Sequence, residues 1–276
     1  GFYSTATYVH EAKRLGANVK LPCINESQYL TRITGIDIYL GFIHIERLEY
    51  KLAKAIIRER YINGPYHSLD DFMQRIHIGI EQVVLLIRIG AFSFSGKSKK
   101  TLLWEVHVLW HAHQKIEYQA SSLFKKEAKQ YQYPNIEDTP IENALDELEL
   151  LGFTISSSYF DLLKTSHRGD VYADDLIQYV GKEVRIMGKL AHIKNVPTSN
   201  GKKMIFGTFM DDRNTLFDTV NFPSSLVQYP FQGSGIYLIM GIVTEDFNHP
   251  TIKVKKMAKL PLLDIGNLDI AFATIH

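Results

Sequence analysis

The stretch Ile87–Glu105 reads IRIGAFSFSGKSKKTLLWE and contains the end of one helix, a tight turn and the start of a second helix. Gly90-Ala91-Phe92 ends the first helix, because glycine is a strong local breaker. The turn that follows, SGKSKK, is polar and basic. Leu102, Leu103, Val106 and Trp110 then recur at helical spacing. The stretch therefore predicts two helices that are joined by a short, positively charged turn.

Upstream of this stretch the same architecture is repeated. Apolar residues recur at helical spacing from Ile45 until the break at Asn63-Gly64-Pro65. Ser68 and Asp71 resemble a capping box that opens the next short helix. Before these helices, the alternating segment TRITGIDIYLGFIHI is typical of a small β-hairpin. The first half of the chain is thus predicted to be a compact set of short helices.

Downstream the pattern changes twice. Residues 114–139 are rich in Gln, Lys, Tyr and Ser with little apolar periodicity, so we expect an exposed linker. An amphipathic helix follows and stops at Gly152. From Val184 onward five strand-like segments follow one another, with a short helix, PSSLVQYPF, between the third and the fourth. The predicted fold class is α+β multidomain, with a helical part followed by a small five-stranded barrel.

Composition limits the function classes only weakly. The chain has 276 residues and a formal net charge of +1, so it lacks the overall basicity of many nucleic-acid binders. A single cysteine, Cys23, excludes an intrachain disulfide and is typical of the reducing cytoplasm. The longest apolar runs are too short for a transmembrane helix. The chain begins without Met, and we expect it to be a fragment of a longer protein.

Several motifs together resemble the C-terminal region of the bacterial DNA polymerase III alpha subunit family. Residues 1–27 contain EAKRLG and LPCINES, which are similar to the end of the fingers region of that family. GFIHIERLEYKLAKAIIRER at 41–60 and the unit at 68–92 resemble its tandem helix-hairpin-helix. QASSLF at 119–124 resembles its internal clamp-binding motif, and the C-terminal strands resemble its OB fold.

The resemblance implies four segments. These are a fingers end at 1–35, a tandem helix-hairpin-helix domain at 36–118, a linker with the clamp peptide and a connecting helix at 119–165, and an OB-fold domain with a C-terminal tail at 166–276.

In this family, glycines of the hairpin let backbone N–H groups approach a DNA phosphate. The glycine positions of the first hairpin fall on Arg47 and Glu49, so both glycines are lost. Arg47 and Lys51 are the expected side-chain contacts there, although the first hairpin could instead only support the second. At the second hairpin, phosphate contact is expected from Lys97, Lys99 and Lys100. The alternative is that these lysines form an ordinary solvated loop.

The clamp peptide is the sharpest short motif. Gln119 would offer hydrogen bonds while Leu123 and Phe124 fill an apolar pocket of the ring-shaped sliding clamp. Ser122 is a further expected clamp-binding residue. The alternative is that Leu123 and Phe124 dock on helices of the chain itself.

The OB resemblance implies contact with single-stranded DNA through the face of the second and third strands and the flanking loops. The candidates are Lys194, Lys202, Lys203, Phe206 and Phe209. Alternation along the strand does not decide which phenylalanine faces outward, and either one could be a core residue. Lys253, Lys255 and Lys256 on the last strand could contact DNA or protect a sheet edge.

No catalytic centre is predicted. His107, His111 and His113 lie close together with Glu105 as the one further ligand at a matching spacing, which is too few for a convincing metal site. Each acidic pair falls at a helix start or a turn. No cofactor is therefore expected for this segment, while the resemblance implies Mg²⁺ and nucleotide transfer for the upstream part of the parent polymerase.

The resulting hypothesis is a segment that holds duplex and single-stranded DNA and the sliding clamp, with other replisome subunits as further candidate partners. The rival hypotheses are a free-standing nucleic-acid-binding accessory protein and a protein-interaction hub without DNA binding.

Overall fold

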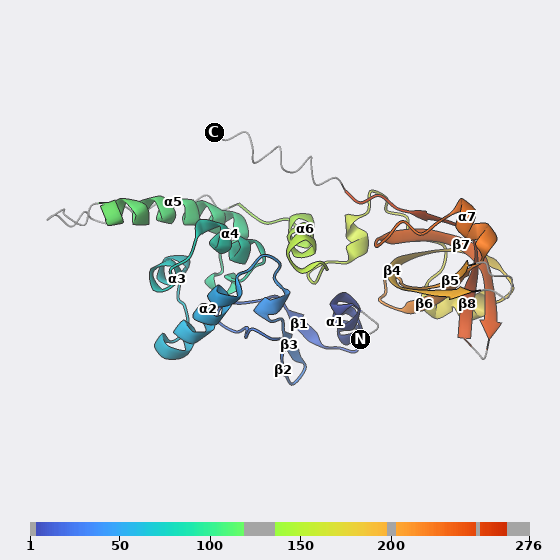
Figure 1. Ribbon diagram of the computed structural model, residues 1–276, viewed down its shortest axis with the longest axis horizontal. Helices are drawn as coiled ribbons and strands as arrows, with labels where there is room; N and C mark the ends of the chain where they lie inside the picture. Colours follow the sequence, from blue (N-terminus) through green and yellow to red (C-terminus); the bar gives the residue numbers. More distant parts are fainter. Residues whose placement is uncertain (1–3, 119–135, 198–202, 247–248, 264–276) are drawn as a thin grey trace. The chain divides into compact units, whose positions relative to one another are not determined.

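The computed structural model describes residues 4–118, 136–197, 203–246 and 249–263 (Figure 1). The chain divides into two compact units. One comprises Gly16–Ser157 and is mainly helical. The other joins the N-terminal residues through Leu15 to the barrel that follows Ser158. Each unit is described by itself.

The helical unit starts with a small sheet and continues as short helices. The sheet order is β1-β3-β2, with β1 parallel and β2 antiparallel to β3. The hairpin expected at 31–45 is therefore present, although it also takes β1 as a third strand. The elements of this unit are β1 (Asn18–Lys20), β2 (Arg32–Thr34), β3 (Asp37–Tyr39), η1 (Phe42–His44), α2 (Tyr50–Asn63), α3 (Leu69–Arg75), α4 (Ile80–Arg88), η2 (Ser93–Ser95), α5 (Lys99–Tyr118) and α6 (Pro140–Leu151).

The core of the helical unit is aromatic. Phe72 lies edge-on to both Tyr66 and Phe92, with ring centroids 5.1 and 5.2 Å apart. All three rings are fully buried. The Tyr66 hydroxyl donates to the carbonyl oxygen of Ile56 at 2.9 Å, so the one polar group in this cluster is satisfied. These contacts tie α2, α3 and the turn after α4 into one body.

Two expected helix boundaries were wrong. The first residues of the apolar pattern that starts at Ile45 lie in a loop, and α2 begins only at Tyr50. The predicted linker starts too early as well, because residues 114–118 continue α5. The capping box expected at the start of α3 is present only in part. The backbone N–H of Asp71 donates to the Ser68 hydroxyl at 3.0 Å, whereas the Asp71 carboxylate accepts from the backbone N–H of His67 at 2.9 Å.

The second unit is built around a closed five-stranded barrel. Its strand order is β4-β5-β6-β8-β7, and β4 pairs with both β5 and β7, which closes the barrel. In chain order this is first, second, third, fifth, fourth, with a helix between the third and fourth strands. That is the OB topology, and the expected fold class is confirmed. The elements are β4 (Glu183–Pro197), β5 (Lys203–Met210), β6 (Leu216–Asn221), α7 (Pro223–Gln228), β7 (Ile236–Asp246) and β8 (His249–Lys259).

Tight packing inside the barrel requires small residues at defined positions. A Cβ atom on Gly188 would lie 2.7 Å from both the Phe209 Cβ and the Phe217 Cζ. Glycine at this position therefore admits the aromatic rings that fill the barrel.

The same unit contains α1 (Thr5–Arg14) and the 3-10 helices η3 (Tyr159–Leu162) and η4 (Ala173–Tyr179).

Candidate nucleic-acid interface

The first hairpin turn retains a glycine-like backbone although it has no glycine. Arg47 has a φ of 66°, in the left-handed region that few side chains adopt. The side-chain amide of Gln82 spans the turn. Its Nε2 donates to the carbonyl oxygen of Arg47 at 3.1 Å, and its Oε1 accepts from the backbone N–H of Glu49 at 3.1 Å. Because Gln82 belongs to α4, the second helical pair holds the bend of the first.

Helix α2 begins directly after this turn, and its N-terminal end faces outward. Glu49 is the N-cap residue, and its side chain makes no capping hydrogen bond. Lys51 and Lys54 are exposed on the first turns, and the Lys54 ammonium lies 5.5 Å from the centroid of the Tyr50 ring. The N–H groups, the helix dipole and two lysines thus favour an anion here, opposed by the exposed Glu49 carboxylate.

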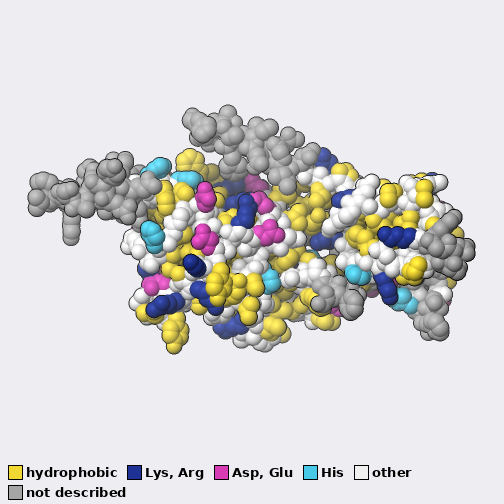
Figure 2. Space-filling view, viewed as in Figure 1, with side chains coloured by type: hydrophobic (Ala, Val, Ile, Leu, Met, Phe, Trp, Pro, Cys, Tyr) yellow, Lys and Arg dark blue, Asp and Glu magenta, His cyan; other side chains and the backbone are white. Residues whose placement is uncertain are grey.

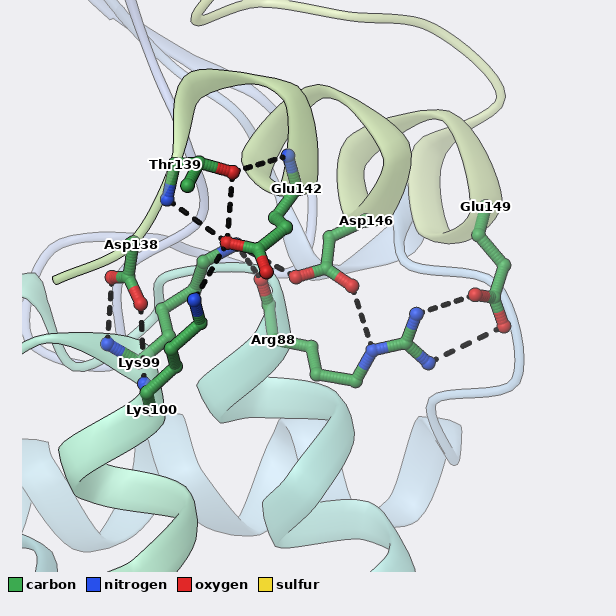
Figure 3. A network of polar contacts seen from close by, with 8 residues as sticks. All are labelled: Arg88, Lys99, Lys100, Asp138, Thr139, Glu142, Asp146 and Glu149. Atoms are coloured by element: carbon green, nitrogen blue, oxygen red, sulfur yellow. Dashed lines mark hydrogen bonds and ion pairs between the residues drawn. The ribbon is translucent and has the colours of Figure 1, made fainter. Parts of the chain in front are cut away.

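The second hairpin has the glycines that the first one lacks. Gly90 and Gly96 have φ values of 81° and 68°. At the start of α5, the Ser98 hydroxyl accepts from the N–H of Thr101 at 3.1 Å. The preceding donors are also occupied, as Figure 3 shows. The Asp138 carboxylate accepts from the backbone N–H of Lys99 at 2.8 Å and from that of Lys100 at 3.2 Å.

The lysine side chains of the second hairpin point at carboxylates of the same chain. Lys99 Nζ donates to the carbonyl oxygen of Arg88 and to Asp146 Oδ2, both at 2.8 Å. Lys100 Nζ lies 2.9 Å from Glu142 Oε2, and Lys97 Nζ lies 2.6 Å from Glu105 Oε2. The three residues predicted to contact phosphate are brought together as expected, but each is paired with a carboxylate of this unit.

One face of α6 supplies most of these carboxylates. Glu142, Asp146 and Glu149 are spaced by four and three residues, which places them on the same side of the helix (Figure 3). We call these three residues together with Asp138 the acidic stripe. Glu149 pairs with Arg88 and, at 2.5 Å, with Arg47 of the first hairpin. The hydrogen bonds from Arg88 and Arg47 hold the pKa of Glu149 below its usual value.

The acidic stripe was not singled out by our reading of the sequence. Its signal was the helical spacing of Glu142, Asp146 and Glu149, but an exposed acidic helix face is common and does not reveal its partners. On the face seen in Figure 2, basic and acidic side chains of the helical unit are interspersed. Several basic side chains of this unit are therefore paired with nearby carboxylates.

The barrel presents a different surface. Lys194, Phe206, Val220 and Lys253 are consecutive register partners across β4, β5, β6 and β8. Directly opposed residues point to the same side of a sheet, so these four form one row on the outside of the barrel. Lys194 is exposed, and Phe206 retains 37% of its accessible surface. We call these four residues the outer row.

One predicted contact residue is corrected. Phe209 is fully buried, and its ring stacks with Phe217 and Phe231 at centroid distances of 5.7 and 6.2 Å. It is a core residue, because Ile205, Gly207 and Phe209 form the buried side of β5, whereas the alternate residues from Met204 to Thr208 are less buried. It cannot stack on a base in this structure. Lys203 is exposed at the start of β5, and Lys202 lies outside the described residues.

A second exposed aromatic residue lies close to the outer row. Phe222 retains 36% of its accessible surface, and the Lys253 ammonium lies 4.9 Å from its ring centroid. The two residues line a groove together with Gln228 and Lys255. Lys253 pairs with Val220 on one side and with Ile242 on the other, so the suggestion that it protects a sheet edge was wrong.

The remaining predicted site falls outside the described residues. This is the clamp-binding peptide with Gln119, Ser122, Leu123 and Phe124. Within the described part of the chain, no group of three or more His, Cys, Asp or Glu side chains could hold a metal ion. None of the described helices is both long and apolar enough to cross a membrane.

Sequence comparisons agree with the resemblance inferred from the motifs. Residues 16–102 match the family described as helix-hairpin-helix motif. A DNA polymerase III subunit alpha from Staphylococcus epidermidis is 31% identical over 253 residues, which is 86% of this chain and 22% of that protein. One from Staphylococcus aureus is 31% identical over 241 residues, or 82% and 21%. The chain thus spans about a fifth of these relatives, and its resemblance to the polymerase III alpha subunit is confirmed.

Two solved structures are similar to about a third of this chain. The second OB-fold domain of replication protein A from Methanococcus maripaludis is 14% identical with a TM-score of 0.23, covering 31% of this chain and 91% of that one. A putative nucleic acid-binding lipoprotein from Klebsiella pneumoniae is 19% identical with a TM-score of 0.25, covering 33% and 78%. Both TM-scores are below 0.5, and the OB topology rests on the strand order of the barrel alone.

Proposed function

We propose that this chain, similar over most of its length to part of the DNA polymerase III alpha subunit, binds DNA and the sliding clamp for a replicative polymerase. Duplex DNA binds at the first hairpin, single-stranded DNA binds along the outer row of the barrel, and the clamp binds residues 119–124. Nucleotide transfer and its Mg²⁺ belong to a polymerase core outside this chain, and no cofactor is assigned to the chain itself.

The single observation that carries duplex binding is the geometry of the first hairpin. Arg47 holds the left-handed bend, Gln82 braces it, and the N-terminal end of α2 opens outward beside Lys51. Backbone N–H groups in this arrangement contact phosphates without reading the base sequence. That Lys97, Lys99 and Lys100 also contact duplex phosphates stays a prediction. In this structure the ammonium group of each forms an ion pair with a carboxylate.

Duplex binding can be tested at Lys51. Replacing Lys51 by Gln removes one positive charge from the first hairpin, and we expect the affinity for a short duplex to fall about 3-fold to 10-fold. The slope of log affinity against log salt concentration should become shallower by about one. Fluorescence anisotropy at four salt concentrations measures both quantities.

The matched control is Lys182→Gln, which removes the same charge from an exposed position of the barrel unit. Equal losses for the two variants would mean that only net charge matters and that the first hairpin is not the site. Duplex binding that is absent, or independent of salt, would instead favour a protein-interaction role.

Clamp binding is supported by the motif QASSLF and by the relatives that the chain resembles. Leu123 and Phe124 are the proposed anchors, because a pair of large apolar side chains in a polar segment fits a preformed apolar pocket. Replacing both by Ala should abolish capture by purified sliding clamp while duplex affinity stays unchanged. Undiminished capture by this double variant would refute the assignment.

A further inference from the structure

The acidic stripe occupies the groups that a DNA phosphate would use at the second hairpin. A phosphate bound at a helix N-terminus accepts from the first backbone N–H groups and attracts nearby cations. Asp138 does the former, since its two carboxylate oxygens accept from the N–H groups of Lys99 and Lys100. Asp146 and Glu142 take the place of a phosphate's negative charge by pairing with the ammonium groups of Lys99 and Lys100.

The stripe is held in place by packing of α6 as well as by charge. Ala144 and Leu150 of α6 are fully buried, and Leu151 is nearly so. The carbonyl oxygen of Leu150 also accepts from the backbone N–H of Glu46 at 2.7 Å, beside the first hairpin. Moving α6 away would expose its buried apolar face to water, which is unfavourable, so we expect the acidic stripe to stay in place in the folded unit.

We propose that the acidic stripe is an autoinhibitory contact that closes the second hairpin to duplex DNA. The inference rests on the proposed duplex binding and refines it: the chain as it stands uses one hairpin, although its fold contains two. Negative carboxylates beside the N-terminus of α5 repel phosphates. The backbone N–H groups that would donate to a phosphate already donate to Asp138.

The test uses an opened variant of the full chain, Asp138→Ala with Glu142→Gln. It frees the N–H groups of Lys99 and Lys100 and the Lys100 ammonium, while Asp146 still pairs with Arg88 and Lys99. We expect duplex affinity at low salt to rise about 3-fold to 10-fold. The salt slope should become steeper by about one, because one more phosphate is contacted.

Lys100→Gln distinguishes a second hairpin that is closed to DNA, as proposed for the natural chain, from one that is open, as in the variant. In the natural background it should leave duplex affinity within about 2-fold, because the ammonium is paired with Glu142. In the opened background it should remove most of the gained affinity. Glu137→Gln is the charge control, since it removes one negative charge from the residue that precedes Asp138. The opened variant removes two, so the gains in affinity are compared per charge removed.

Two outcomes of the duplex titrations overturn the inference without refuting duplex binding. One is that Lys100→Gln weakens the natural chain as much as the opened one, which means that the second hairpin already contacts DNA. The other is an opened variant that melts like the natural chain by circular dichroism but gains no more affinity than Glu137→Gln. If Lys51→Gln still weakens binding in that case, duplex binding survives and only the closure is refuted. A chain that binds no duplex in any form refutes both.

If the opened variant melts at a lower temperature, amide signals decide the question. The backbone N–H resonances of Lys99 and Lys100 should shift on duplex addition in Asp138→Ala alone and stay unchanged in the natural chain. Unshifted signals in the variant would overturn the inference.

Discussion

Lys194 and Phe206 lie directly opposite each other on β4 and β5, with both side chains on the outside of the barrel. Exposed aromatic rings and basic side chains on one face are the combination that single-strand binders use, since a ring stacks on a base and a cation contacts a phosphate. Val220 and Lys253 extend this surface over the next two strands.

We therefore expect Phe206→Ala to weaken binding of a short single strand by about 1–3 kcal/mol, the usual value of one stacked base. Val227→Ala is the matched control, because Val227 is 84% exposed on α7 and does not belong to the outer row. Anisotropy titration of a labelled oligonucleotide measures both. Equal affinities for the Phe206 variant and the natural chain would rule out a base platform at this position.

Arg47→Gly should stabilise the helical unit by about 0.5–1 kcal/mol. Glycine adopts the left-handed conformation of residue 47 without strain, and the exposed ion pair with Glu149 that is lost contributes little. Urea unfolding followed by circular dichroism measures the change. Asn214→Gly is the comparison, because Asn214 has a φ of 60° in the barrel unit and Asn tolerates this region better than Arg. A destabilised Arg47 variant would show that the ion pair outweighs the strain.

Protonation of His10 should destabilise the barrel unit in acid. Burial, with further contributions from Lys189 and Lys13, lowers the pKa of His10 from 6.5 to about 4. The folded chain therefore stays neutral at His10 while the unfolded chain binds a proton. The free energy of unfolding should fall as the pH drops from about 6.5 to about 4, by up to about 3 kcal/mol. His10→Gln should flatten this part of the profile, and an unchanged profile would contradict the prediction.

Lys189→Met should stabilise the barrel unit near neutral pH. Burial lowers the pKa of Lys189 to about 8, and its ammonium lies 4.2 Å from the centroid of the Tyr159 ring. The charged form is thus penalised in the folded state, and Met keeps the aliphatic stem without the charge. We expect a gain of about 1–3 kcal/mol below pH 8.

The sign of the pH dependence provides the check on Lys189. Its folded pKa lies below the unfolded one, so the penalty disappears as the pH rises from about 8 to about 10.5. The advantage of Lys189→Met should shrink over that interval. A gain that is independent of pH would indicate better packing instead of relief of a buried charge.

Much of the fold could be predicted because it depends on local patterns. The short helices around Ile87–Glu105 and the five strands after Val184 were found from apolar periodicity, and both are present. The prediction was wrong where local and tertiary preferences differ. The apolar period from Ile45 continues smoothly, yet the chain turns at Arg47 because Gln82, 35 residues away, holds that turn.

The candidate sites show the same division. Sequence identified Lys99 and Lys100 as basic residues at a helix start, and the structure agrees. It did not identify their partner Asp138, because that residue reaches the start of α5 only when α6, which follows it, packs against α4. Phe206 and Phe209 looked equivalent in an apolar strand, and only closure of the barrel buried one and exposed the other.

The sequence by itself determined the order of elements and the residue types available for binding, because helical and strand periods are properties of the local backbone. Only the tertiary structure decided which of those charges remain free. The acidic stripe neutralises the second hairpin, while the end of α2 stays open beside Lys51. The physical reason is that charge pairing depends on distance in space, and packing of remote segments sets that distance.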